Sequence, residues 1–239
     1  MHRLAALGLV LATLAALGAA VTGPGYRLEL WPLGTAFAVL RWSAYGAIAA
    51  TVLSLACAGP LLLRRRWHGA AIALAAVVLG IAVAAVPYAN LRIVRTVPPI
   101  HDITTDLKDP PLFVEMLARR AGAPNPAAYG GPAVADQQRA GYPHLGPLVL
   151  EAGREQAFAR ALTVARDLGW EIVAAVPEQG RIEATARTFW FGFADDVVVR
   201  ITAADGASRV DVRSVSRVGR SDAGANARRI ERFLARLGN

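Results

Sequence analysis

The chain has 239 residues, of which 54% are hydrophobic, and a formal net charge of +8. From Tyr88 onward, 20 basic residues stand against 17 acidic ones. This balance lacks the dense basic stripe that nucleic-acid binding requires, so nucleic acid is not an expected partner. Cys57 is the only cysteine, which excludes an intramolecular disulfide and a cysteine-based metal or redox motif.

Three long apolar stretches predict a transmembrane region over residues 1–91. They cover about residues 4–21, 42–63 and 69–89, and a helix needs about 20 apolar residues to span a bilayer. Apart from Arg41 near an edge, no charged side chain enters these stretches. Because intramembrane charge usually marks a transport pathway, we expect an anchor rather than a channel or carrier.

The arginines between the apolar stretches predict the orientation of the chain. Arg64, Arg65 and Arg66 separate the second stretch from the third, and Arg3 precedes the first. Short loops rich in arginine stay in the cytoplasm. Three crossings then place the C-terminal domain outside the cytoplasm.

An alternative interpretation makes residues 1–22 a cleaved signal peptide. This segment has Arg3, an apolar centre and small residues around Ala19 and Ala20, as such peptides do. Either interpretation leaves the C-terminal domain on the same side of the membrane.

Residues 92–109 are predicted to be a linker that leads into a soluble domain over residues 110–239. The run from Val97 to Ile100 contains two prolines and favours an extended chain. Asp109 with two following prolines predicts the start of a helix that ends at Arg119 or Arg120. The proline- and glycine-rich residues 121–147 indicate a long loop, either mobile or, as we favour, draped over the domain.

The rest of the domain predicts an α+β fold in which a four-stranded antiparallel meander lies between two helices. Apolar spacing indicates a helix over residues 154–168, and Ser221 with Asp222 caps a final helix. The apolar face of that final helix consists of Ile230, Phe233, Leu234 and Leu237. Alternation predicts strands over residues 170–176, 181–188, 195–202 and 208–215.

The last two strands allow a prediction of their register. If Asp205-Gly206 is a two-residue hairpin turn, Ile201 faces Val210 and Val199 faces Val212. The apolar faces of both strands then coincide, as burial requires. The same register places Arg200 opposite Asp211 on the other face.

Several segments of the C-terminal half together resemble one bacterial family. They are Pro98–Asp106, Tyr142–Pro143, Gly180–Thr185, Phe189–Phe193, Asp195–Arg200, Arg209–Ser214 and Ser216–Asp222. The set is similar to the domain of unknown function 1499 (DUF1499) family over about residues 97–237, and the N-terminal apolar stretches also look like membrane-anchored members. Leu107-Lys108 departs from the pattern as a variable spacer. The resemblance implies no reaction, cofactor or catalytic residue.

One candidate site consists of His101, Asp102 and Asp106. An imidazole beside carboxylates can bind a metal or act as a general base, which would suit an envelope hydrolase. Their spacing matches no established ligand pattern, and aspartates after a proline pair more often form a turn. We therefore predict no metal site and no cofactor, and keep the hydrolase as the alternative function.

A second candidate is a set of arginines on the strand face opposite the apolar one: Arg187, Arg200, Arg213 and Arg217. Converging guanidiniums can hold a carboxylate or phosphate through paired hydrogen bonds. Three carboxylates share this face and can neutralise the arginines in pairs: Glu183, Asp196 and Asp211. We favour a solvated, charge-laced sheet face, which becomes a site only where an arginine lacks a protein partner.

The aromatic connection from Phe189 to Phe193 is the third candidate, with Trp190 at its centre. Core packing under the final helix is the favoured interpretation. Packing against the proline-rich segment and contact with the membrane interface are the alternatives. An exposed aromatic tip would indicate a binding or lipid-contact surface.

These features favour a membrane-anchored extracytoplasmic binding or interaction module over an enzyme. Its expected partners are the lipid bilayer and either an envelope protein or a small anionic ligand.

Overall fold

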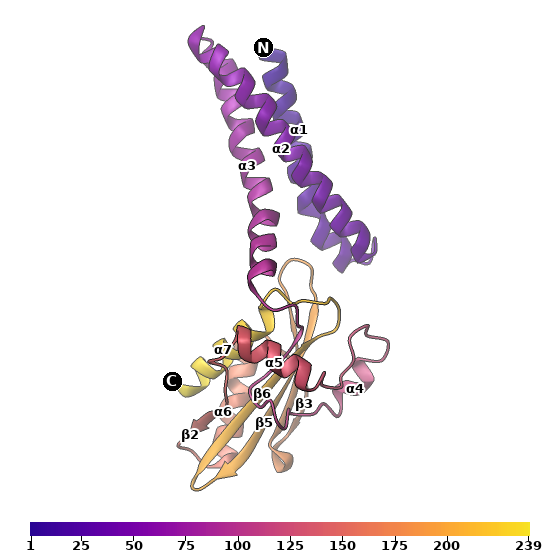
Figure 1. Ribbon diagram of the computed structural model, residues 1–239, viewed down its shortest axis with the longest axis vertical. Helices are drawn as coiled ribbons and strands as arrows, with labels where there is room; N and C mark the ends of the chain where they lie inside the picture. The colour runs from indigo at the N-terminus through magenta and orange to yellow at the C-terminus, as the bar shows by residue number, and fades with distance from the viewer. The chain divides into compact units, whose positions relative to one another are not determined.

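The computed structural model describes residues 1–239, and their contacts divide them into two units (Figure 1). The helical unit contains Met1–Arg92 together with Trp190–Gly192. The C-terminal unit contains Ile93–Phe189 and Phe193–Asn239.

The helical unit consists of three long helices, as predicted. They are α1 (His2–Arg27), α2 (Leu33–Leu63) and α3 (Trp67–Thr96), and each is long and apolar enough to cross a membrane. Each helix contains its predicted apolar stretch and extends beyond it. Helix α3 continues through Pro87 to Thr96, so the first residues of the predicted linker are helical, whereas the end of the membrane span near residue 89 stays a prediction. The residues after Pro87 include alanine, leucine and arginine, which are strong helix formers.

Small side chains let these helices pack closely. Eight alanines of the three helices are fully buried: Ala5, Ala12, Ala36, Ala47, Ala50, Ala70, Ala73 and Ala76. Gly80 of α3 lies against α2, where an added Cβ would meet Thr51 and come within 2.8 Å of the Ala47 carbonyl oxygen. Close approach of this kind is how helices associate in a bilayer, where apolar burial gives little driving force.

The packing at Gly80 predicts an effect of a single methyl group. In Gly80→Ala the new Cβ collides with a backbone carbonyl that cannot rotate away, so we expect a loss of about 1–3 kcal/mol in the stability of the helical unit. The melting temperature of the detergent-solubilised chain measures this loss. The matched control is Gly59→Ala, because nothing lies within 4 Å of that position. Equal melting temperatures for both variants would contradict the close packing.

The C-terminal unit contains the predicted meander, and its four strands lie in consecutive antiparallel order. They are β3 (Glu171–Val176), β4 (Arg181–Arg187), β5 (Ala194–Ala204) and β6 (Ala207–Ser216). The predicted number of strands is wrong, because β1 (Asp102–Thr104) and β2 (Leu148–Leu150) also pair with β6. Each added strand has three residues, too few to show alternation in the sequence.

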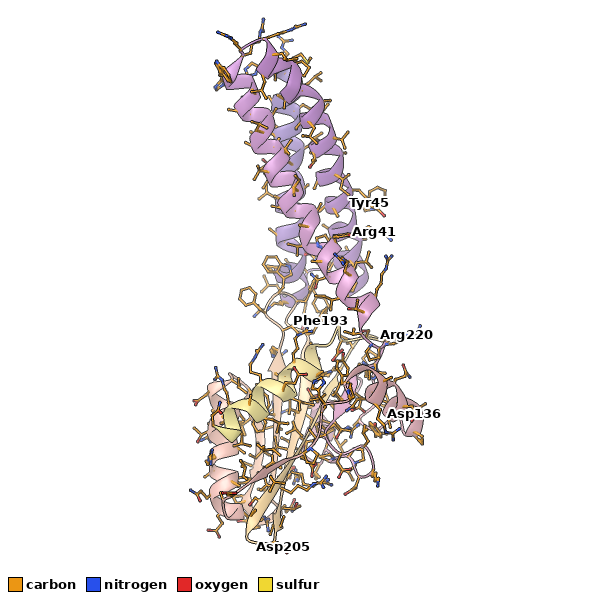
Figure 2. All side chains as sticks on the ribbon, turned by 60° about the vertical axis from the view of Figure 1, so that its left-hand side comes forward. Arg41, Tyr45, Asp136, Phe193, Asp205 and Arg220 are labelled. Atoms are coloured by element: carbon orange, nitrogen blue, oxygen red, sulfur yellow. The ribbon has the colours of Figure 1, made fainter.

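The predicted register of the β5–β6 hairpin is confirmed. Ile201 pairs with Val210 and Arg200 with Asp211, and Val199 faces Val212. The turn, at one tip of the domain in Figure 2, has positive φ at both central residues, 39° at Asp205 and 81° at Gly206. A two-residue turn of this kind matches the twist of the strands it joins.

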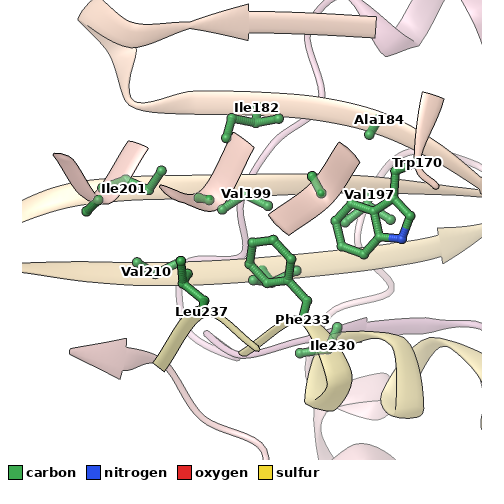
Figure 3. Close-up of a cluster of buried hydrophobic side chains, with 14 of the residues drawn as sticks. Trp170, Ile182, Ala184, Val197, Val199, Ile201, Val210, Ile230, Phe233 and Leu237 are labelled. Atoms are coloured by element: carbon green, nitrogen blue, oxygen red, sulfur yellow. The ribbon is translucent and has the colours of Figure 1, made fainter. Parts of the chain in front are cut away.

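Helices α6 (Arg154–Asp167) and α7 (Ala225–Gly238) cover one face of the sheet (Figure 1). Both were predicted, and the apolar side chains assigned to the last helix are buried or, for Leu234, partly buried against the core. Figure 3 shows the centre of this core, where the Trp170 and Phe233 rings stack at 5.1 Å. Inward-facing residues of three strands complete it: Ile182, Ala184, Val197, Val199, Ile201, Val210 and Val212.

Residues 110–147 differ from expectation in two places. The helix predicted after Asp109 ends at Arg119 as expected, but its predicted start is wrong, because α4 comprises only Met116–Arg119. The Glu183 carboxylate accepts the backbone N–H groups of Val114 and Met116 and holds the preceding chain in place. The predicted loop over residues 121–147 contains helix α5 (Pro132–Gly141), which has proline at its first position. A short 3-10 helix, Pro177–Gln179, joins β3 to β4.

The second face of the sheet is buried under residues 105–129, which we call the covering segment. Phe113 and Met116 from this segment pack on Val198 and Val215. The expectation of a solvated outer face is therefore wrong. The face is nevertheless charged, so its charges have to be paired inside the protein.

Arginine–aspartate pairs neutralise this buried face. Arg213 donates to both carboxylate oxygens of Asp102, at 2.9 and 2.7 Å, and both side chains are buried. Arg120 of the covering segment and Arg217 of the sheet both donate to Asp196. The covering segment is thus fixed to the sheet by charge pairs as well as by apolar contacts.

The Arg213–Asp102 pair predicts a large loss of stability in Asp102→Ala. The variant leaves a guanidinium with no exposed surface and no carboxylate partner, which costs about 3–5 kcal/mol. Urea-induced unfolding of the full chain in detergent, followed by near-ultraviolet circular dichroism, measures the change. The control is Glu171→Ala, which breaks the exposed Arg119–Glu171 pair and should cost at most about 1 kcal/mol. A loss as small as that of the control would show that the buried pair does not secure the segment.

Candidate anion-binding site

The structure does not bring His101, Asp102 and Asp106 together as a catalytic group. His101 Nδ1 lies 3.4 Å from the Arg220 carbonyl oxygen, and both Asp102 oxygens accept from Arg213. Asp106 belongs to a separate group of charges. These residues thus occupy structural positions in and beside β1.

Asp106 forms the turn that the sequence suggested. Its carboxylate accepts the backbone N–H groups of Lys108 and Asp109, both at 3.0 Å, and the side chains of Arg200 and Arg209. Burial acts to raise the pKa of Asp106, but the two N–H groups and the two guanidiniums outweigh it and lower the pKa below its usual value. Asp106 is therefore a stable carboxylate that orders the start of the covering segment.

Three of the four candidate arginines are occupied by aspartates. Arg200 donates to Asp109 at 2.7 Å and also to Asp106 and Asp211. Arg213 is paired with Asp102, and Arg217 with Asp196, as described above. The hydrogen bond with Asp196 raises the pKa of Arg217. The predicted pairwise neutralisation by Asp196 and Asp211 is confirmed, so this part of the face has no guanidinium free for a ligand.

Arg187 is the exception. It lies at the end of β4, and its exposed side chain has no hydrogen bond or ion pair with another residue. It lines a pocket of about 340 Å³ together with three arginines of α7: Arg228, Arg229 and Arg232.

Helix periodicity explains why the α7 arginines converge. Residues three and four apart lie on the same face of a helix, and the pocket-lining positions of α7 are 225, 228, 229 and 232. Ile230, Phe233 and Leu237 occupy the opposite, buried face. Burial of one face of α7 therefore presents the arginines of the other face to the pocket.

The start of α7 is fixed by Asp222. Its carboxylate accepts the backbone N–H groups of Gly224 and Asn226, at 2.8 and 2.7 Å. Burial raises the pKa of Asp222, and the two N–H groups oppose that effect. The N-cap residue of α7 is Gly224, without a side-chain cap, so the predicted capping by Ser221 and Asp222 is wrong. Asp222 instead holds the turn that leads into the helix.

The charge of the pocket is only partly compensated. Arg229 donates to Asp195 at 2.5 Å, to Ser214 at 3.0 Å and to Asn226. The side chains of Arg228 and Arg232, like that of Arg187, have no hydrogen bond or ion pair with another residue. None of the lining residues is acidic, so the pocket has an uncompensated positive charge.

Apolar groups form another part of the wall. The connection from α6 to β3 contributes Leu168, Gly169 and Trp170, and the end of β4 leads into Thr188 and Phe189. Gly169 has a φ of 74°, which glycine adopts without strain and which lets the chain turn sharply from the helix into the strand. The pocket thus combines guanidiniums with an apolar wall.

Trp190, the remaining candidate, does not line this pocket. Phe189 and Trp190 are 86% and 43% exposed, so the expectation of core packing under the last helix is wrong for them. Trp190–Gly192 groups with the helical unit, in which the Phe191 ring lies 5.5 Å from the Phe37 ring. The Trp190 indole N–H donates to Thr22 Oγ1 at 3.5 Å in the same unit.

Only one of the four pocket arginines was predicted from the sequence. Arg187 was a candidate because of its strand parity, whereas Arg228, Arg229 and Arg232 were not considered. In the sequence, these arginines occupy the polar positions of α7, on the face that its apolar residues leave free. Whether this face of α7 lies beside the end of β4 depends on how the helix packs on the sheet.

Comparison with known proteins identifies the family of the chain. No match was found among curated proteins. Residues 102–237 match the family described as protein of unknown function DUF1499. This range covers more than half of the chain and contains every strand and the pocket described above. On this evidence the chain belongs to the DUF1499 family.

Proposed function

We propose that this protein is a membrane-anchored module whose C-terminal domain binds a small anionic ligand in the arginine pocket. The observation that carries the proposal is a cavity of about 340 Å³ bordered by three guanidiniums without carboxylate partners. Planar guanidiniums bind carboxylate and phosphate through paired hydrogen bonds. A cavity of this volume is in the range that accommodates a small molecule.

The composition of the pocket favours binding over catalysis. A guanidinium stays protonated and cannot serve as a general base, and no histidine, carboxylate or cysteine lines the cavity. Thr188 supplies a hydroxyl group but has no base beside it among the lining residues. The hydrolase alternative finds no support in the positions of His101 and Asp102, since Asp102 is held by Arg213.

The three apolar helices support the membrane part of the proposal. Their length and composition suit membrane spans, and Arg64, Arg65 and Arg66 between α2 and α3 favour a cytoplasmic position for that turn. The C-terminal domain then lies on the extracytoplasmic side of the bacterial inner membrane. There it can bind an anion of the envelope space or of an envelope protein.

The pocket predicts which arginines matter for binding. In Arg187→Gln and Arg228→Gln, each variant loses charge-assisted hydrogen bonds worth about 1.5–3 kcal/mol. The affinity for a phosphate probe such as pyrophosphate should therefore fall about tenfold or more in each. Isothermal titration calorimetry of the full chain in neutral detergent measures this affinity.

The control variant is Arg236→Gln, which removes the same charge from the last turn of α7 without touching the pocket. Its affinity should stay within about twofold of that of the unmodified chain, because exposed charges at a distance are largely screened by salt. Equal losses in all three variants would indicate nonspecific attraction and would refute the pocket.

The proposed orientation predicts the side on which the C-terminus lies. An alkaline phosphatase fused after Asn239 should be active, because this enzyme matures only outside the cytoplasm. The same fusion after Arg66 should be inactive, since this turn is assigned to the cytoplasm. An inactive C-terminal fusion at normal abundance would place the domain on the opposite side.

A further inference from the structure

We infer that the arginine-rich end of the helical unit binds the phosphate of an anionic phospholipid headgroup. This inference rests on the membrane insertion proposed above and is independent of the arginine pocket of the C-terminal domain. The observation behind it is a second pocket, of about 370 Å³, within the helical unit. It is lined by His2, Leu61, Arg66, Trp67, His68 and Gly69.

The three helices each contribute to this pocket. His2 is the first residue of α1, Leu61 lies near the end of α2, and Trp67 begins α3. The turn between α2 and α3 is tight: Arg65 has a φ of 53°, and the Arg66 N–H donates to the Leu61 carbonyl at 2.9 Å. This geometry holds Arg66 beside the helix ends and keeps it from extending as a free loop.

The two histidines are in contact across the pocket. The rings of His2 and His68 meet edge to face with centroids 5.5 Å apart, although the residues are far apart in the sequence. An imidazole offers an N–H donor, and the nearby guanidinium of Arg66 offers several more. Together these groups provide donors from two helices for the oxygens of one phosphate.

No acidic side chain compensates the charge at this end. Four arginines lie here: Arg3, Arg64, Arg65 and Arg66. None of them has a hydrogen bond from its side chain or an ion pair within the protein. Glu29 is the only acidic residue among residues 1–92, and it lies in the turn at the opposite end of α1. An anion from outside the chain therefore has no internal competitor.

The apolar lining favours a lipid over free phosphate. Leu61 is buried, Gly69 is buried, and Trp67 is 65% exposed beside the charged turn. Tryptophan is enriched where the headgroups of a bilayer meet its hydrocarbon region. Basic pockets between transmembrane helices on the cytoplasmic side suit anionic headgroups, whose acyl chains lie along the apolar helices.

Positive charge at this turn is also expected from orientation alone, since cytoplasmic loops are rich in arginine. Orientation depends on the number of arginines and not on which one lines a cavity. A built headgroup site depends on position, because Arg66 lines the pocket and Arg64 does not. Replacing each of these two neighbouring residues in turn therefore distinguishes a specific headgroup site from a general excess of positive charge.

The test compares Arg66→Gln with Arg64→Gln in the full chain, purified in a neutral detergent. Binding of phosphatidylglycerol is measured by native mass spectrometry, with phosphatidylcholine as the zwitterionic reference. We expect preferential binding of phosphatidylglycerol by the unmodified chain and by Arg64→Gln. Arg66→Gln should lose about tenfold in affinity, as expected when a charge-assisted contact is removed.

Two substitutions of His68 test whether a loss of binding could come from misfolding of the turn. His68→Gln keeps an N–H donor at the pocket and should retain most of the binding, whereas His68→Leu should weaken it. Arg41→Gln removes an arginine from α2 well away from this end, as Figure 2 shows, and should have no effect. Comparable losses in Arg64→Gln and Arg66→Gln would overturn the site and leave only a charge bias.

Further measurements distinguish a lipid from a soluble anion, and failure of this inference from failure of the proposed function. Displacement of phosphatidylglycerol by millimolar inorganic phosphate would overturn the lipid assignment in favour of a soluble anion. Release of the chain from membranes by alkaline carbonate would overturn membrane insertion, and this inference with it. Arg187→Gln should leave lipid binding unchanged, so failure of the anion pocket in the C-terminal domain is detected separately.

Discussion

The structure of the C-terminal domain depends on the charge pairs buried between the sheet and its covering segment. A buried guanidinium needs a carboxylate within hydrogen-bonding reach, and Arg213 with Asp102 supplies the clearest case. Asp102 lies in β1, next to the start of the covering segment, so this one pair fixes the path by which the chain enters the domain. The same pairing occupies arginines that would otherwise be available to a ligand. Only the arginines that have no carboxylate partner within the fold are left to bind an external anion.

The arginine pocket contains arginines that the buried charge pairs leave without a partner. Arg187 is the last residue of β4, where it pairs with Ala194, and its side chain forms no ion pair with the aspartates that neutralise the other arginines of the sheet. Helix α7 buries its apolar face against the core and thereby turns its arginines toward the same place. Asp195 holds only Arg229, which leaves the other guanidiniums uncompensated. The packing of the core and the charge of the pocket are therefore two consequences of the same helix orientation.

Sequence patterns predicted those parts of the fold that depend on residues close together in the chain. Alternation and the Asp205-Gly206 turn were sufficient to predict the β5–β6 register, because both strands bury one face. The shortening of the helix after Asp109 was not predictable, since its N–H groups are accepted by Glu183, about seventy residues later in the chain. The short strands β1 and β2 exist only because β6 offers them an edge. Likewise, Arg187 was found through strand parity, but its convergence with Arg228 depends on helix docking, which the sequence does not show.

Arginine has opposite functions in different parts of this chain, and its identity alone does not say which. Lys108 is the only lysine, so nearly every cation of the protein is a guanidinium. A guanidinium can stay charged inside a protein because its planar array of donors matches a carboxylate, and Arg213 is used in this way. The same array, left without an acid, becomes a binding group for an external anion, as we propose for Arg187 and Arg66. The deciding variable is the distance to the nearest carboxylate, a property of the fold and not of the residue. In this chain, an arginine that is available to an external anion is therefore identified by the absence of a carboxylate partner.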